Sequence, residues 1–108
     1  MAATPPTGYT IPAAAAQLLA TAQAAGWRTL TSWTPPAYQR APFLTVRVGL
    51  HASNGGIWHY RLTWHSRGCA PGHVRLFSSV ARTPGHPAWH NGPSLKAIRA
   101  VIAQNPNT

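Results

Sequence analysis

The 108-residue sequence contains no aspartate and no glutamate. Without side-chain carboxylates it cannot build a two-metal phosphoryl-transfer centre, a glycosidase carboxylate pair or an Asp-oriented catalytic triad. Eight arginines and one lysine, Lys96, give a formal net charge of +9. Because these like charges repel one another in a compact chain, we expect a molecule outside the chain to neutralise them.

Cysteine and long apolar runs are also scarce. The single cysteine, Cys69, excludes an intrachain disulfide. No apolar run approaches the roughly 20 residues that a membrane-spanning helix needs. The Ala/Leu-rich stretch at 13–25 follows no lysine or arginine, since Arg28 is the first cation, so it lacks the basic segment of a signal peptide. The sequence therefore predicts a cytoplasmic protein.

The pattern of apolar residues predicts one domain. Residues 1–9, rich in Pro, Gly and Thr, are expected to be a flexible leader, and residues 10–105 a single α+β domain. Helical spacing predicts a helix at about 12–25, with Thr10 as its N-cap and Gly26 just after its end. A second helix is expected at 94–104, ended by Asn105 and Pro106.

Between the helices, period-two alternation predicts strands at 27–34, 43–50, 57–67 and 73–82. On the fourth strand this parity turns Val74, Leu76 and Val80 inward. The Pro-rich segment 83–93 reads as a long loop. The expected fold is helix, four-stranded antiparallel meander, helix, with both helices on one face of the sheet.

The hairpin between the second and third strands can be tested for register. A two-residue loop would set apolar residues opposite charged ones, because a slip of one residue inverts both faces. A three-residue loop at 53–55, with Gly55 in the left-handed conformation, corrects this. The pairs it predicts are Leu50–Trp58, Val48–Tyr60, Val46–Leu62, Leu44–Trp64, Thr45–Thr63 and Arg47–Arg61.

The polar face of this sheet is the leading candidate site, because arginine side chains match the oxygen geometry of phosphate. The predicted phosphate contacts on it are Arg47, His59, Arg61, His65, Arg67 and Arg75. Lys96 and Arg99 on the closing helix form a second basic candidate. Phe43 and Phe77 share the polar face by parity and could stack on bases, while Trp89 in the loop is a further contact candidate.

Two other kinds of site use the cysteine and the histidines. His65, Cys69 and His73, together with His86 and His90, offer zinc-ligand types. Cys69 with a neighbouring histidine could also act as a nucleophile. Prolines interrupt the segment that would carry a metal site, and no carboxylate can support the ligands. We therefore expect no metal, no cofactor and no catalytic residue.

The order of elements is similar to that of the double-stranded RNA-binding domain, which has a helix, three strands and a second helix. AQLLATAQAAGW followed by APFLTVRVGL resembles the first half of that fold. The resemblance covers about half of the chain. The lysine-rich start of that family's last helix is reduced here to Ser94, Leu95 and Lys96, and a fourth strand is expected.

Charge and pattern together predict a small, non-catalytic nucleic-acid-binding protein, for DNA or RNA. The alternative is a protein-interaction module, such as an inhibitor or a basic subunit, whose partner is an acidic protein. A third possibility is a structural protein of a mobile genetic element. A membrane surface is not an expected partner, because the sequence has no basic amphipathic helix.

Overall fold

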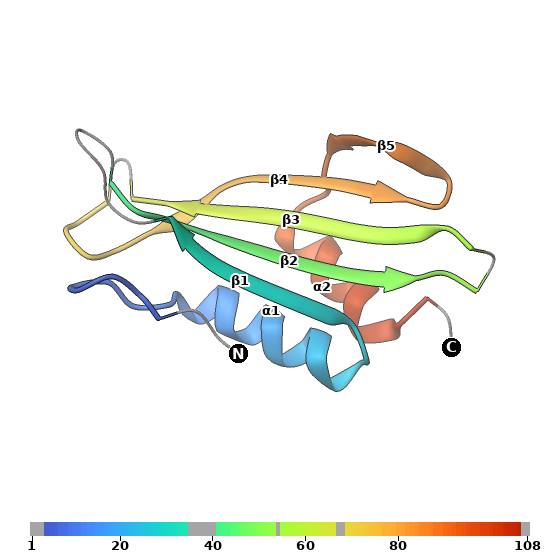
Figure 1. Cartoon of the computed structure of the whole chain (residues 1–108), viewed down its shortest axis with the longest axis horizontal. Helices are drawn as coiled ribbons and strands as arrows, with labels where there is room; N and C mark the ends of the chain where they lie inside the picture. The colour runs from blue at the N-terminus through green and yellow to red at the C-terminus, as the bar shows by residue number, and fades with distance from the viewer. Residues whose placement is uncertain (1–3, 35–40, 54, 67–68, 107–108) are drawn as a thin grey trace.

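The computed structural model describes residues 4–34, 41–53, 55–66 and 69–106. It is an α+β structure in which five antiparallel strands lie in sequence order, β1-β2-β3-β4-β5 (Figure 1). The elements are α1 (Ala13–Ala24), β1 (Arg28–Thr34), β2 (Phe43–His51), β3 (Ile57–His65), β4 (Arg75–Thr83), β5 (His86–Asn91) and α2 (Leu95–Gln104). The predicted α+β class is confirmed, but the predicted number of four strands is wrong.

The additional strand, β5, lies in the segment that was predicted to be a loop. It pairs with β4 through Val80 and Asn91, Ala81 and His90, and Thr83 and His86. Proline is tolerated on an edge strand, where one side of the backbone makes no ladder hydrogen bonds, so Pro87 does not prevent the pairing. The strand forms because β4 offers a free edge, and the local sequence carries no alternation that would reveal it.

The first helix begins later than predicted. Its N-cap is Pro12, which makes no side-chain capping bond, so the assignment of Thr10 as the N-cap is wrong. Its end is as predicted: Gly26 follows the C-cap with φ of +87°, and Trp27 N donates to Ala22 O at 2.9 Å. Glycine occupies this left-handed position at no steric cost.

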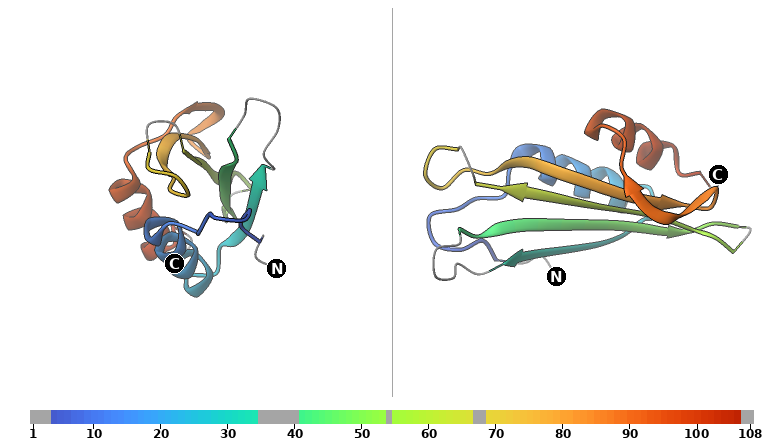
Figure 2. Two further views of the ribbon diagram at one scale, coloured as in Figure 1. Left: turned by 90° about the vertical axis from the view of Figure 1, so that its left-hand side faces the viewer. Right: turned by 90° about the horizontal axis from the view of Figure 1, so that it is seen from above.

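The second helix carries its own cap. Ser94 precedes it in an extended conformation, and its side-chain oxygen accepts a hydrogen bond from Ala97 N at 3.3 Å. The helix ends at Asn105, as predicted. Ile98 and Ile102 are fully buried, whereas Lys96 and Arg99 are exposed. The two helices contact each other (Figures 1 and 2).

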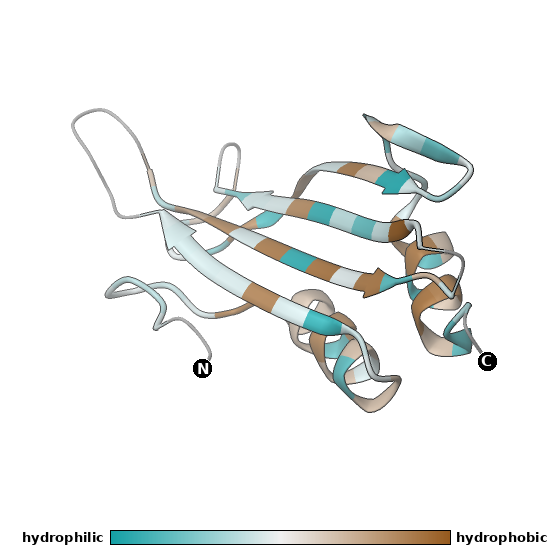
Figure 3. Cartoon of the chain, turned by 45° about the vertical axis from the view of Figure 1, so that its right-hand side comes forward, coloured by the Kyte–Doolittle hydropathy of each residue, from teal (hydrophilic) through white to brown (hydrophobic). Residues whose placement is uncertain are grey.

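One apolar cluster joins both helices to the sheet. From α1 it includes Ala15, Leu18 and Ala22, and from α2 Ile98 and Ile102. The sheet contributes alternate residues of β2 and β3, which are Leu44, Val46, Val48, Tyr60, Leu62 and Trp64. Brown bands alternate with pale and teal ones along these strands in Figure 3. Trp27 links the residue just before β1 to α2, because its indole Nε1 donates to Ile102 O at 3.1 Å.

The register of the β2–β3 hairpin is confirmed at every predicted pair, including Arg47 opposite Arg61. Gly55 has φ of +92°, and Ala52 N donates to Gly56 O at 2.8 Å, which closes a loop of three residues. Asn54, at the centre of that loop, lies outside the described residues. Apolar alternation therefore determines this register.

Strand β4 departs from simple alternation. Thr63 pairs with Ser78 and Trp64 pairs with Leu76, so Phe77 is an extra residue in a bulge. A bulge of this kind reverses the facing of every residue beyond it. Val80 consequently lies opposite Arg61 and away from the core, so its predicted inward orientation is wrong. The fully buried Ala81 takes the core position instead.

Candidate nucleic-acid interface

The polar face is the side of the sheet whose residues alternate with those of the apolar cluster, and its cations form rows across the strands. The pairings place Arg28 of β1 beside Gly49 of β2, Gly49 beside His59 of β3, and His59 beside Arg82 of β4. We call this set the first row. Arg28 and the imidazole of His59 thus flank a residue with no side chain, and Arg82 lies beyond His59.

A second row lies two residues further along each strand. Here Leu30 pairs with Arg47, Arg47 with Arg61, and Arg61 with Val80. Neighbouring strands lie about 4.8 Å apart, so Arg47 and Arg61 hold like charges side by side. With no carboxylate side chain anywhere in the sequence, no acidic residue of the chain can separate them.

Trp89 of β5 packs onto these two rows. The guanidinium carbons of Arg61 and Arg82 lie 5.1 Å and 4.9 Å from the centre of its indole ring. The imidazole of His59 lies 4.9 Å from the same ring, tilted by 58°. Such cation–π contacts contribute about 0.5–1 kcal/mol each at exposed sites. The indole therefore holds two arginines in place where an acidic residue would ordinarily do so.

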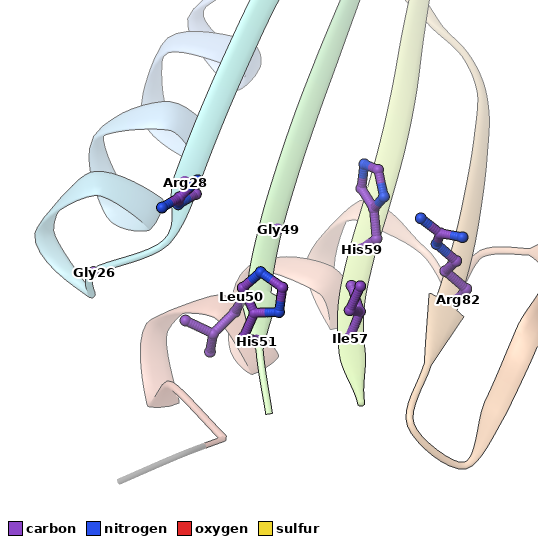
Figure 4. A pocket seen from close by; sticks show the side chains of 8 residues that line it. All are labelled: Gly26, Arg28, Gly49, Leu50, His51, Ile57, His59 and Arg82. Carbon is purple, nitrogen blue, oxygen red and sulfur yellow. The ribbon is translucent and has the colours of Figure 1, made fainter. Parts of the chain in front are cut away.

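The first row lines a pocket of about 300 Å³ at one end of the sheet (Figure 4). Arg28, His51, His59 and Arg82 come from four adjacent strands around it, and Gly49 forms part of its lining. A second hollow of about 340 Å³, which shares Arg28, Gly49 and His59, continues toward Arg47 and Leu30. The missing side chain at Gly49 thus leaves space between cationic groups.

His59 is the titratable group most affected by this setting. Its pKa is lowered from the ordinary value of 6.5, first by burial and then by the charges of Arg82, Arg47 and Arg61. The neutral form of the imidazole is therefore the predominant one at pH 7. A bound anion would oppose those three charges and raise this pKa, so binding an anion should be coupled to proton uptake.

Arg82 also carries an unsatisfied donor. Its Nε is buried, and no atom in the described part of the chain accepts a hydrogen bond from it. A buried donor without a partner costs about 1–3 kcal/mol. The polar face thus contains a guanidinium whose hydrogen-bonding capacity is incompletely used within the described residues.

Beyond the cationic rows, the polar face becomes hydroxyl-rich and then aromatic. Ser32, Thr45, Thr63 and Ser78 form the next row. After it, the ring of Phe43 stacks on His65 with centroids 6.1 Å apart, and Phe77 lies 5.7 Å from the same imidazole. Phe77 is 67% exposed.

The structure brings most of the sequence-predicted residues together on this face. They are Arg47, His59, Arg61, His65, Arg75, Phe43 and Phe77, and Trp89 joins them from β5. Arg67 lies outside the described residues. Lys96 and Arg99 lie on α2 beside Thr21 of α1, so they form a separate basic patch on the helices.

Sequence reasoning missed two cations of the first row. Arg28 shares its parity with Leu30, so extending the hairpin register to β1 could have placed it on the polar face. Arg82 could not be placed in this way, because the bulge at Phe77 reverses the facing of the residues that follow.

The residues considered for a metal or nucleophile site include Cys69, which follows β3, and His86 and His90 of β5. Within the described ranges, no three side chains of His or Cys gather as a metal site requires. His86 and His90 stack in parallel at 3.8 Å, and His90 Nδ1 lies 3.0 Å from Ala88 O. Cys69 Sγ contacts the backbone oxygen of His65 at 3.8 Å.

None of the helices in the described ranges has the length and apolar character needed to cross a bilayer. The chain matches no protein-family model, no curated protein and no solved structure.

Proposed function

We propose that this chain is a non-catalytic nucleic-acid-binding domain that contacts phosphates with its polar face, while both helices pack on the other face of the sheet. One observation carries the proposal. Arg28, Arg47, Arg61 and Arg82 occupy two adjacent rows of one sheet face in a chain without any Asp or Glu. The oxygens of a phosphate match the planar fork of a guanidinium group.

The charge arrangement also sets the expected strength of the salt dependence. Four to six phosphate contacts on duplex DNA give a slope of log K against log salt of about −4 to −5. The test measures fluorescence anisotropy of labelled 20-mer duplex DNA, duplex RNA and single strands between low and high salt. Failure to bind any of them at low salt would refute the proposal.

A matched pair of double variants locates the interface. Arg47→Gln with Arg61→Gln removes two charges from the polar face, and should reduce the magnitude of the slope by about 2. Lys96→Gln with Arg99→Gln removes the same charge from the helix patch, and should reduce it less. A larger loss from the helix pair would place the interface on α2 and overturn the assignment to the sheet.

An acidic protein partner remains the second candidate, and the exposed apolar side chains favour it. Leu30 is 59% exposed and Ile57 37% exposed on the edge of the same polar face. Interface cores in protein complexes combine arginine with such apolar groups. This candidate would be supported instead if the pure chain bound no nucleic acid and if its complex with an acidic protein from cell extract survived nuclease treatment.

A further inference from the structure

The polar face carries one exposed aromatic side chain beside its cationic rows and another beyond its hydroxyl row. Trp89 is 41% exposed beside His59, and Phe77 is 67% exposed beside His65. His59 and His65 are six residues apart on β3, so the two histidines that these aromatic side chains contact are about 20 Å apart along the strand. Cations and then hydroxyl groups fill the interval between them.

This arrangement discriminates between forms of nucleic acid. A duplex presents sugars and phosphates on its outside and keeps its base faces stacked inside. Pressed against this sheet, it would leave the exposed rings of Trp89 and Phe77 against polar backbone. An unpaired strand offers base faces, which stack on aromatic side chains while its phosphates contact a basic groove.

The hollow at Gly49 adds a place for one phosphate. Arg28 and His59 stand on either side of this glycine, about 9 to 10 Å apart at two strand spacings. The backbone does not require glycine here, because an added Cβ would meet only Trp58 O, at 3.7 Å. The space is therefore free for a ligand and could be filled by a larger side chain without strain.

We propose that the polar face binds single-stranded nucleic acid, which lies along β2 and β3 with one phosphate over Gly49 and with bases stacked on Trp89 and Phe77. This inference rests on the proposed nucleic-acid function and names its substrate class. The charges attract the backbone, and the separated aromatic side chains supply the preference for unpaired bases.

The first test measures the affinity of the chain for three labelled ligands at 0.1 M salt. They are a 12-nucleotide oligo(dT), the duplex that it forms with oligo(dA), and a duplex RNA of the same length. We expect the single strand to bind at least about ten-fold more tightly than either duplex, since each base stacked on an aromatic side chain contributes roughly a factor of ten. Equal or tighter duplex binding overturns this inference but leaves the proposed function intact. Absence of binding to all three overturns both.

Variants test the stacking and the hollow. Phe77→Ala should weaken oligo(dT) binding by about ten-fold, with little effect on duplex binding. Leu30→Ala, which removes an exposed apolar side chain that is not aromatic, should have a smaller effect. Gly49→Val should leave the thermal midpoint no lower, because valine favours strands, and should weaken oligo(dT) binding by filling the hollow. Unchanged oligo(dT) affinity in both Phe77→Ala and Gly49→Val overturns the inference.

A spectroscopic readout reports on Trp89 directly. Stacking of a base on the indole should quench part of the tryptophan fluorescence when oligo(dT) binds. Trp89→Phe keeps an aromatic ring against Arg61 and Arg82 but removes the indole. Oligo(dT) binding should therefore persist, while the quenching of tryptophan fluorescence on binding decreases. Identical quenching in the wild type and this variant means that no base stacks on Trp89, and it overturns that part of the path.

Discussion

Replacing Arg47 by glutamate should stabilise the fold and weaken the binding of nucleic acid. Arg47 is exposed, pairs directly with Arg61 across β2 and β3, and also depresses the pKa of His59 through its charge. Arg47→Glu would turn a like-charge pair into an opposite-charge pair. It leaves the contacts of Arg61 and Arg82 with Trp89 in place.

The magnitude follows from the two parts of this change. Removing a cross-strand repulsion and adding an exposed attraction should together raise the free energy of unfolding by about 0.5–1.5 kcal/mol at low salt. For a domain of this size the thermal midpoint should then rise by roughly 2 to 7 °C. One lost phosphate contact costs about eight-fold in affinity at 0.1 M salt, and the new negative charge should make the total loss larger.

The assay combines urea denaturation, followed by tryptophan fluorescence, with anisotropy of a labelled oligonucleotide at several salt concentrations. Arg99→Glu on α2 makes the same change in net charge away from the polar face, and provides the comparison. The stability gain of Arg47→Glu should shrink in 1 M salt, because the screening length there is about 3 Å, shorter than the spacing of the paired strands. A variant that loses stability at low salt, or that binds as well as Arg99→Glu, would contradict the argument.

Three further predictions concern stability. The pKa of folded His59 lies below its unfolded value of about 6.5, so the unfolded chain binds more protons in acid. The free energy of unfolding should therefore be constant with respect to this group above about pH 6.5 and decline below it. His59→Gln should flatten that decline in urea titrations at several pH values. Trp27→Phe removes the donor to the Ile102 oxygen and should lower the free energy of unfolding by about 1–3 kcal/mol; a urea midpoint within error of the wild type would mean that this bond contributes nothing. Ser94→Ala removes the cap that receives Ala97 N and should cost about 1 kcal/mol, whereas Ser94→Asp should retain most of the stability; equal loss in both variants would exclude a capping role.

Local alternation was enough to determine the centre of the sheet. Apolar residues of β2 and β3 alternate with polar ones, so a shift of one residue would bury Arg47 and Arg61 and expose Val48 and Tyr60. This cost selects a single register, which is the one observed. The same pattern placed most of the candidate contact residues on one face, and the missing acidic residues were visible from composition alone.

The tertiary structure decided the edges of the candidate site. The sequence around Phe77 does not indicate an extra residue, because a bulge depends on how β4 fits the twist of β3. This bulge turns Arg82 onto the polar face. Strand β5 likewise forms only by pairing with β4, and that pairing brings Trp89 onto Arg61 and Arg82. The sequence by itself determined the charge and the central register, since both depend on residue type and on the period of apolar residues. Trp89 lies against the first row only because strands pair with one another, and no local pattern encodes those contacts.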